Sequence, residues 1–262
     1  MTTLRTETFA DGLALTFDDR GTGRAVLVLH GGGGPFTVAR FVEAMSAHSR
    51  VIAPVHPGFG GTPRPESFDS VEQLADAYVA LLDRLALRDV LVIGLSIGGW
   101  IANAIALRAG DRLRGLVLVN GAGIMVDGEP CADVFSLTPQ QLSALSYHDP
   151  ARFGIDPATL TDVQKAGMAA NMKTLAVYGR ARDMGDPSLR ARLADIRVLV
   201  LVVWGESDRV VTPAYGRAVA ASFPRARLEI IPRCGHMPQI EQPERLLELV
   251  ASLDEEVLGS AP

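Results

Sequence analysis

The segment Asp89–Trp100, with the sequence DVLVIGLSIGGW, restricts the fold of this chain more than any other stretch. An apolar run, Val90–Ile93, leads directly into Gly-Leu-Ser-Ile-Gly, and a helical pattern follows. This order predicts a buried strand, a very sharp turn and a helix, an arrangement in which the hydroxyl of Ser96 projects clear of the sheet edge. Gly94 and Gly98 fit the turn, because a Cβ at either position would collide with the neighbouring strand or helix. The motif alone also arises by chance, so its meaning depends on the rest of the chain.

Strand and helix patterns alternate through most of the sequence. The N-terminal stretch 3–18 predicts a hairpin that turns at Asp11-Gly12. Continuous apolar runs predict strands at 25–29, 51–54, 90–93, 116–119, 198–204 and 228–231. Helical spacing predicts helices at 36–48, 70–87, 97–107, from Thr212-Pro213 and from Pro243. This alternation is typical of an α/β fold, with a mostly parallel central sheet and helices on both of its faces.

The alternation stops near Gly121 and resumes near residue 195. Between these points the sequence has no strand-like run, and its periodicity predicts short helices at Thr138–Ser146, Thr161–Tyr178 and Ser188–Leu193. We therefore predict a helical insertion over residues 123–189, after the sixth strand. The α/β core would then consist of residues 1–122 and 190–262.

Composition and charge argue against a nucleic-acid-binding or membrane-spanning protein and fit a small, uncharged substrate better. The 262 residues are 48% hydrophobic, which is enough for one large α/β domain. The net charge of -5 comes from interspersed charges, so the sequence has no electrostatic footprint for nucleic acid. No apolar run approaches the ~18 residues of a membrane span, and no signal-like segment begins the chain. Cys131 and Cys234 form no ligand cluster. We expect a soluble, cytoplasmic monomer or homodimer without metal or cofactor.

Four glycines, Gly31–Gly34, follow the apolar run that ends at Leu29. A phosphate-binding loop would need Lys and Ser or Thr after the last glycine, but Pro35-Phe36 stands there. The spacing of a dinucleotide-binding loop is also missing. Two interpretations stay open. The loop could present backbone N–H groups to a developing oxyanion, or it could simply be flexible.

Three residues with complementary chemistry each follow a predicted parallel strand. They are Ser96, Asp208 and His236, and their positions place them at the carboxyl edge of the sheet, where such folds carry their sites. A neutral serine hydroxyl is a weak nucleophile, so it needs a base, and the base needs a carboxylate to fix its tautomer. The order Ser, Asp, His is the one that accompanies a strand-borne Gly-x-Ser-x-Gly turn.

Other residues could fill the roles of base and acid. His30 and His56 also lie in loops at the predicted edge, where they could instead hold backbone in place. Glu206 lies close to Asp208 in sequence, and Asp127 follows the preceding strand. We favour His236 and Asp208 because Glu206 is expected to face solvent and Asp127 would require a less usual placement of the acid.

These motifs together resemble the α/β-hydrolase superfamily. The similarity covers nearly all of the predicted core and is carried by HGGGGP, PVHPGFGGT, GLSIGGW, WGESDRVV and CGHMPQIEQPE. The resemblance implies Ser96 as nucleophile, Asp208 as orienting acid and His236 as base. It also implies an oxyanion hole formed by the backbone N–H of Ile97 and that of Gly32 or Gly33.

The resemblance also narrows the reaction. Haloalkane dehalogenases and epoxide hydrolases of this superfamily use an aspartate nucleophile, and Ser96 argues against both. Carbon–carbon bond hydrolases of meta-cleavage products are similar in the glycine loop and in GLSIGG, but they usually carry Trp where this chain has Met237. The leading hypothesis is therefore a serine hydrolase of small carboxylic esters, lactones or thioesters that works through an acyl-serine intermediate. The alternatives are a C–C bond hydrolase or cofactor-free lyase acting on a diketone-type substrate, and a small-molecule receptor with slow turnover.

The same resemblance places the insertion 123–189 as a cap over Ser96, where it would determine specificity for an apolar or aromatic acyl compound. Trp100, one helical turn after Ser96, either forms the floor of the pocket or fills space in the core. Polar residues that could bind a substrate carbonyl or carboxylate are Tyr147, His148, Asn171 and Arg180. The other residues that could line the pocket, or that could instead pack the insertion onto the core, are Met125, Phe135, Leu142, Met168, Met172, Tyr178 and Met237.

Overall fold

The protein is built around an eight-stranded sheet, seen in a computed structural model that describes residues 4–9, 12–179 and 183–259. The strand order is β1-β2-β4-β3-β5-β6-β9-β10. Strand β2 runs antiparallel to β1 and β4, and the other pairs are parallel. The strands are β1 (Leu4–Thr8), β2 (Ala14–Arg20), β3 (Ala25–Leu29), β4 (Arg50–Val55), β5 (Val90–Leu95), β6 (Leu113–Val119), β9 (Leu199–Gly205) and β10 (Ala226–Ile231). The predicted α/β-hydrolase fold, with its mostly parallel sheet, is confirmed.

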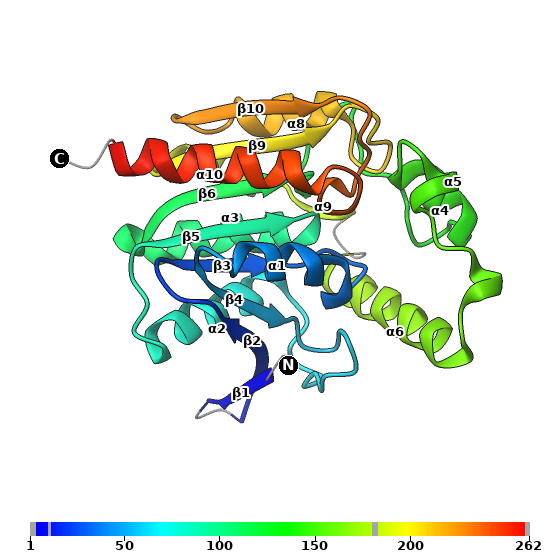
Figure 1. Ribbon diagram of the computed structural model, residues 1–262, viewed down its shortest axis with the longest axis horizontal. Helices are drawn as coiled ribbons and strands as arrows, with labels where there is room; N and C mark the ends of the chain where they lie inside the picture. Colours follow the sequence, from blue (N-terminus) through cyan, green and yellow to red (C-terminus); the bar gives the residue numbers. More distant parts are fainter. Residues whose placement is uncertain (1–3, 10–11, 180–182, 260–262) are drawn as a thin grey trace.

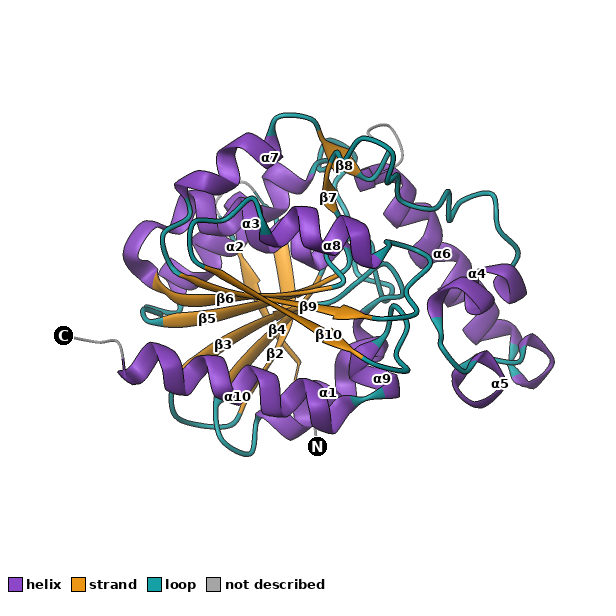
Figure 2. Cartoon of the chain, turned by 90° about the horizontal axis from the view of Figure 1, so that it is seen from above, coloured by secondary structure: helices purple, strands orange, loops and turns teal. Residues whose placement is uncertain are grey.

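Helices cover both faces of this sheet. One face carries α2 (Val71–Arg84), α3 (Ile97–Ala109) and α8 (Pro213–Ala220), and the other carries α1 (Ala39–Met45) and α10 (Pro243–Gly259) (Figure 2). The central strands are apolar along their whole length because alternate residues enter the two cores. In β5, Val90 and Val92 pack under α2 and α3, whereas Leu91, Ile93 and Leu95 pack toward α1 and α10.

Helix boundaries follow local signals in the sequence. Helix α2 begins after Ser70, whose hydroxyl accepts from the backbone of Gln73 while the Gln73 side chain accepts from the backbone of Ser70. This reciprocal cap satisfies donors that an uncapped helix would leave unpaired. The helix expected at 36–48 begins instead as a 3-10 turn, Pro35–Val38, before α1 continues it.

The segment between β6 and β9 is mainly helical, as its sequence pattern predicts. It contains β7 (Gly123–Ile124), α4 (Pro139–Ser146), α5 (Pro150–Phe153), α6 (Asp162–Gly179), β8 (Gly185–Asp186) and α7 (Leu189–Arg192). Helices α4, α5 and α6 lie beyond the carboxyl ends of the parallel strands (Figure 1). The paired strands β7 and β8 and the short helix α5 were not expected from the sequence. The boundaries of this segment as a separate domain stay a prediction.

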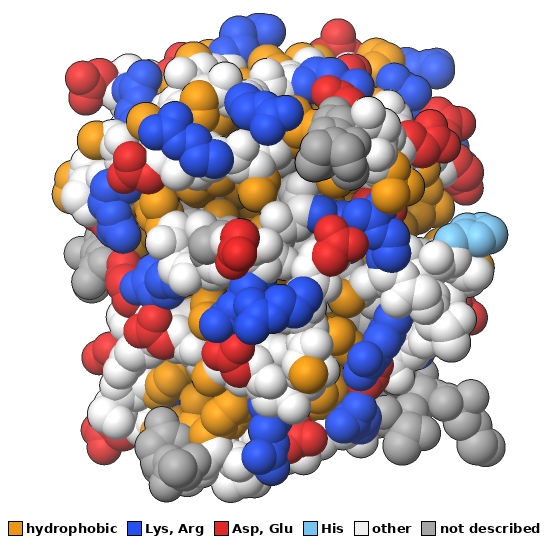
Figure 3. Space-filling model, turned by 90° about the vertical axis from the view of Figure 1, so that its left-hand side faces the viewer, with side chains coloured by type: hydrophobic (Ala, Val, Ile, Leu, Met, Phe, Trp, Pro, Cys, Tyr) orange, Lys and Arg blue, Asp and Glu red, His pale blue; other side chains and the backbone are white. Residues whose placement is uncertain are grey.

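The side of the molecule away from α4, α5 and α6 carries basic and acidic side chains close to one another, with apolar side chains between them (Figure 3). This face therefore presents no large field of a single sign. In the described part of the chain, no helix is both long enough and apolar enough to span a bilayer.

Candidate active site

Ser96 occupies the sharp turn between β5 and α3. Its φ of 54° is unusual for a residue with a side chain and costs on the order of 1–3 kcal/mol. The turn is held by its backbone, since Ser96 N–H donates to Val119 O at 3.0 Å and Ser96 O accepts from Gly99 N–H at 2.8 Å and Ala122 N–H at 3.1 Å. The end of β6 and the residues after it therefore fix the strained turn.

The glycines around Ser96 are required by close packing. A Cβ at Gly94 would overlap the carbonyl of Gly98, and one at Gly98 would overlap the carbonyl of Leu29. A Cβ at Gly99 would come within 2.7 Å of the Gly121 Cα. The expected steric reason for the Gly-x-Ser-x-Gly pattern is thus confirmed.

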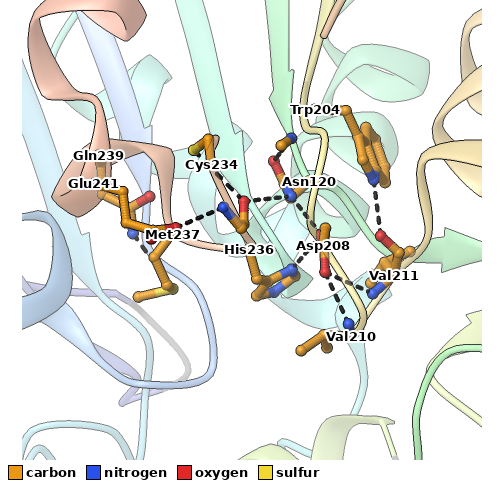
Figure 4. A network of polar contacts seen from close by, with 12 residues as sticks. Asn120, Trp204, Asp208, Val210, Val211, Cys234, His236, Met237, Gln239 and Glu241 are labelled. Atoms are coloured by element: carbon orange, nitrogen blue, oxygen red, sulfur yellow. Dashed lines mark hydrogen bonds and ion pairs between the residues drawn. The ribbon is translucent and has the colours of Figure 1, made fainter. Parts of the chain in front are cut away.

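Asp208 and His236, which follow β9 and β10, lie in contact at the same edge. Asp208 is 2% exposed, and its Oδ2 lies 2.7 Å from His236 Nδ1 (Figure 4). Its Oδ1 accepts from the backbone N–H groups of Val210 at 2.8 Å and Val211 at 3.0 Å. Because an ionised carboxylate only accepts, the imidazole must carry a proton on Nδ1. In the neutral ring Nε2 is then free to accept a proton from a hydroxyl.

Asn120 is a member of this network that was not predicted from the sequence. Its Nδ2 donates to Asp208 Oδ2 and, at 3.3 Å, to Gly235 O, while its Oδ1 accepts from Gly205 N–H at 3.3 Å (Figure 4). The residue is fully buried and has a φ of 48°. A signal was present in the sequence, because Asn120 directly follows a buried parallel strand, as Ser96 does.

A cavity of about 520 Å³ opens between this edge of the sheet and helices α4 and α6. Ser96, His236 and the glycines Gly31–Gly33 contribute to its wall, so the structure brings the predicted nucleophile, base and glycine loop to one space. The wall is otherwise mainly apolar. Residues expected at the substrate that line it are Phe135, Leu142, Tyr147, Met168, Asn171, Met172 and Met237.

Four of the described residues expected at the substrate do not line this cavity. One is His148, whose Nδ1 instead shares a hydrogen bond of 2.8 Å with Ser207 Oγ. The other three are Trp100, Tyr178 and Met125. Trp100 is 1% exposed and packs so closely on β7 that a Cβ at Gly123 would lie 2.5 Å from its Cγ, so the core-filling alternative is correct. Tyr178 is buried, and its hydroxyl donates to Pro57 O at 2.9 Å. Met125 is 43% exposed, and its side chain lies beside Gly185. Residue type alone suggested that Trp100, Tyr178 and Met125 contact the substrate, but in the structure their side chains pack elsewhere.

The glycine loop is held by helix α6 through Asn171. The Asn171 Nδ2 donates to Gly33 O at 2.9 Å, and its Oδ1 accepts from Gly60 N–H at 2.9 Å. This bridge favours an ordered loop over a flexible one. Within the described residues, the N–H groups of Gly32 and Gly33 donate to no other protein group. Ile97 begins α3, where helical N–H groups also lack an intrahelical acceptor.

His30 and His56 form a separate buried pair beneath the loops. His30 Nε2 accepts from His56 N–H at 3.1 Å, and His56 Nε2 lies 3.0 Å from His30 O, to which it must donate. Burial lowers the pKa of His30 to about 4, and burial together with the nearby His30 holds the pKa of His56 well below its usual value. Neither residue lines the cavity, so both hold backbone in place.

The alternative acids are also placed away from the base. Asp127 lies on the connection after β7 and does not line the cavity, and Glu206 is exposed and accepts from Arg233 N–H at 3.1 Å.

Arg180, expected among the polar residues near the substrate, lies outside the described residues. Across the described ranges, no group of three or more His, Cys, Asp or Glu side chains is arranged to hold a metal ion.

Comparison with known proteins agrees with this architecture. The sequence pattern of the alpha/beta hydrolase family matches residues 26–249. The chain is 30% identical to a 2-hydroxymuconate semialdehyde hydrolase of Pseudomonas putida, over 93% of this chain and 92% of that protein. A meta-cleavage product hydrolase from Pseudomonas fluorescens superposes with a TM-score of 0.81 at 26% identity, covering 96% of this chain and 97% of the other. A thermophilic esterase from Thermogutta terrifontis superposes with a TM-score of 0.76 at 26% identity, covering 98% and 99%. The chain therefore belongs to the alpha/beta hydrolase family.

Proposed function

We propose that this protein is a serine hydrolase that cleaves small carboxylic esters, lactones or thioesters through an acyl-serine intermediate. The observation that carries the proposal is the buried Asp208–His236 pair, whose ring lines the same cavity as Ser96. In this assignment Ser96 is the nucleophile, His236 the general base and Asp208 the group that fixes the imidazole tautomer. A strained serine turn with both partners at one sheet edge is the arrangement that acyl transfer needs.

The reaction proceeds in two stages. Ser96 Oγ attacks the substrate carbonyl while His236 Nε2 takes the hydroxyl proton. The resulting oxyanion receives hydrogen bonds from the N–H of Ile97 and from that of Gly32 or Gly33, donors worth about 10²–10³ in rate each. When the tetrahedral intermediate collapses, His236 returns the proton to the leaving oxygen or sulfur. A water molecule, deprotonated by His236, then attacks the acyl-serine, and the carboxylic acid and free Ser96 are released.

The cavity favours a substrate whose acyl part is apolar and uncharged. Its volume of about 520 Å³ lies within the ~300–1,000 Å³ of ligand pockets in general. Among the described residues of its wall, Lys165 is the one side chain with a formal charge, apart from a protonated His236, and it is exposed. A carboxylate deep in this wall would lose hydration without gaining a counter-ion, which is costly.

A second candidate function is hydrolysis of a carbon–carbon bond in a vinylogous diketone acid. It is favoured by the similarity to the 2-hydroxymuconate semialdehyde hydrolase and to the meta-cleavage product hydrolase. The same nucleophile and base would serve this reaction. Met237, which lines the cavity beside His236, stands where relatives of that type usually carry Trp. The apolar wall favours the ester reaction over this one.

A substrate panel separates the two functions. Uncharged esters, lactones and thioesters of graded acyl size would be compared with a vinylogous diketone acid, using wild type and Ser96→Ala. We expect turnover of the uncharged compounds, loss of that turnover in Ser96→Ala, and little reaction of the acid. Turnover of the acid at a kcat/KM that exceeds all ester values would reject the ester assignment and establish the second function.

A further inference from the structure

Glu241 is a buried carboxylate next to the catalytic loop that the reaction described above does not use. It ends the short helix α9 (Pro238–Glu241), which begins two residues after His236. Its exposed fraction is 8%, and its side chain points back toward the His236 loop (Figure 4). A buried carboxylate is costly unless it is well hydrogen-bonded, so its partners indicate why it is there.

The two oxygens of Glu241 bind backbone from two distant segments. Oε2 accepts from Gly235 N–H at 2.5 Å, in the residue before His236. Oε1 accepts from His148 N–H at 2.9 Å and from Asp149 N–H at 3.2 Å. The last two residues belong to the connection between α4 and α5. Because every partner is an N–H donor, the carboxylate, which only accepts, matches the site. In an amide, the NH2 group would face at least one of these donors and could not accept its hydrogen bond.

The α4–α5 connection also contacts the His236 loop directly. His236 N–H donates to Ser146 O at 2.6 Å. A Cβ at Gly235 would lie 2.8 Å from the Tyr147 Cα, so the two backbones approach too closely for any other residue there. His148 Nδ1 and Ser207 Oγ share a further hydrogen bond of 2.8 Å, in the loop before Asp208. The connection therefore touches the loops of both the base and the acid.

We propose that Glu241 is a positioning residue that couples residues 146–149, the last residue of α4 and the connection to α5, to the loop that carries His236. Tyr147, within this connection, lines the cavity. A substrate that packs against Tyr147 therefore contacts the segment whose backbone is hydrogen-bonded, directly and through Glu241, to the loop of His236. The effect of Glu241 on catalysis rests on the proposed function. The coupling itself rests only on the N–H groups of Gly235, His148 and Asp149, which all donate to the Glu241 carboxylate.

Hydrogen exchange and kinetics of Glu241→Gln test the coupling, with Glu248→Gln as the matched control. Glu248 lies on α10, and 67% of its side chain is exposed. In Glu241→Gln we expect the amides of Gly235, His148 and Asp149 to exchange at least about tenfold faster, together. We also expect kcat to fall by about 10²-fold, the effect of a displacement near 1 Å, and the pH profile of kcat/KM to shift. Glu248→Gln should match wild type in each respect.

Native-state hydrogen exchange and active-site labelling of the wild-type protein complete the test. If Glu241→Gln does not fold, native-state exchange of wild type decides, because coupled amides must open with one common free energy. Independent opening of Gly235 and His148, or a folded Glu241→Gln with unchanged exchange, would overturn the coupling. Normal kcat and an unchanged pH profile in that variant would overturn its catalytic role. Labelling of wild-type Ser96 by a fluorophosphonate is measured in parallel, since its absence would reject the proposed function and leave the exchange result valid.

Discussion

The Asn120 side-chain amide donates to Asp208 at Oδ2, the oxygen that faces the ring of His236. The other oxygen, Oδ1, is occupied by the N–H groups of Val210 and Val211. Both oxygens are therefore saturated by donors, and the carboxylate has one orientation available to it. Since Asn120 also accepts from Gly205 N–H, it joins the ends of β6 and β9 at the acid.

Replacing Asn120 should slow catalysis through the position of Asp208. Asn120→Gly is the most informative variant, because the φ of 48° suits glycine and the backbone gains no strain. We expect kcat to fall between about tenfold and about 10²-fold, with a smaller change in KM. Steady-state kinetics with a turned-over ester, together with thermal unfolding, check this. An unchanged kcat in folded protein would show that Asp208 needs no support from Asn120.

Asp208→Asn should remove the tautomer control of His236. An amide can donate to Nδ1, which leaves the proton on Nε2 and removes the base that Ser96 needs. In another serine hydrolase an equivalent change lowers kcat by about 10⁴-fold, and we expect an effect of that order here. Glu206→Gln is the control, because Glu206 is an exposed carboxylate two residues away. Equal activity of the two variants would exclude Asp208 as the orienting acid.

Asn171→Leu should weaken the oxyanion site without touching Ser96 or His236. Its loss frees Gly33 O and Gly60 N–H from the bridge to α6. We expect kcat to fall by at least about tenfold, since one oxyanion donor is worth about 10²–10³. Thr174→Val is the matched control on the same helix, because Thr174 donates to Gly58 O and not to the glycine loop. The prediction fails if both variants lose activity equally.

Acid should destabilise the protein through the buried pair of His30 and His56. The folded pKa of His30, about 4, lies below the ordinary 6.5, so between these values the unfolded chain binds more protons than the folded one. The contribution of neutral His30 to the free energy of unfolding is therefore fully present above about pH 6.5 and is lost as the pH drops toward 4. The contribution of His30 is on the order of 3 kcal/mol.

Urea unfolding from pH 7 to pH 4 in wild type and in His30→Gln measures this contribution. The wild-type free energy of unfolding should fall more steeply between pH 6.5 and 4 than that of the variant. His56, whose pKa is also lowered by burial, adds a loss in the same direction. Parallel curves for the two proteins would show that His30 is not held neutral by the fold.

Long periodic segments made the fold predictable from the sequence. Strands such as β5 are apolar at every position because both of their faces are covered, and such an unbroken run is typical of the central strands of a parallel sheet. Short elements lacked such a signal. Strands β7 and β8 have two residues each, and α5 and α9 have four, too few to establish a period.

The candidate site was predictable where backbone topology determines position. Ser96, Asp208 and His236 each follow a parallel strand, so the fold brings them to one edge. Side-chain direction was not predictable in the same way, and Trp100 and Tyr178 therefore pack inward instead of lining the cavity. Contacts between distant backbone segments, such as those of Glu241, leave no pattern in a single sequence.

Covalent labelling with a fluorophosphonate, followed by mass spectrometry of the intact and digested protein, tests whether Ser96 is an activated nucleophile. Wild type should gain one phosphonyl group per chain, on the peptide that contains Ser96. Ser96→Ala should gain none, and His236→Ala should react at least about 10³-fold more slowly because the hydroxyl has lost its base. Folded wild type that stays unlabelled, or labelling that persists unchanged in Ser96→Ala, would contradict the assignment of Ser96 as an activated nucleophile.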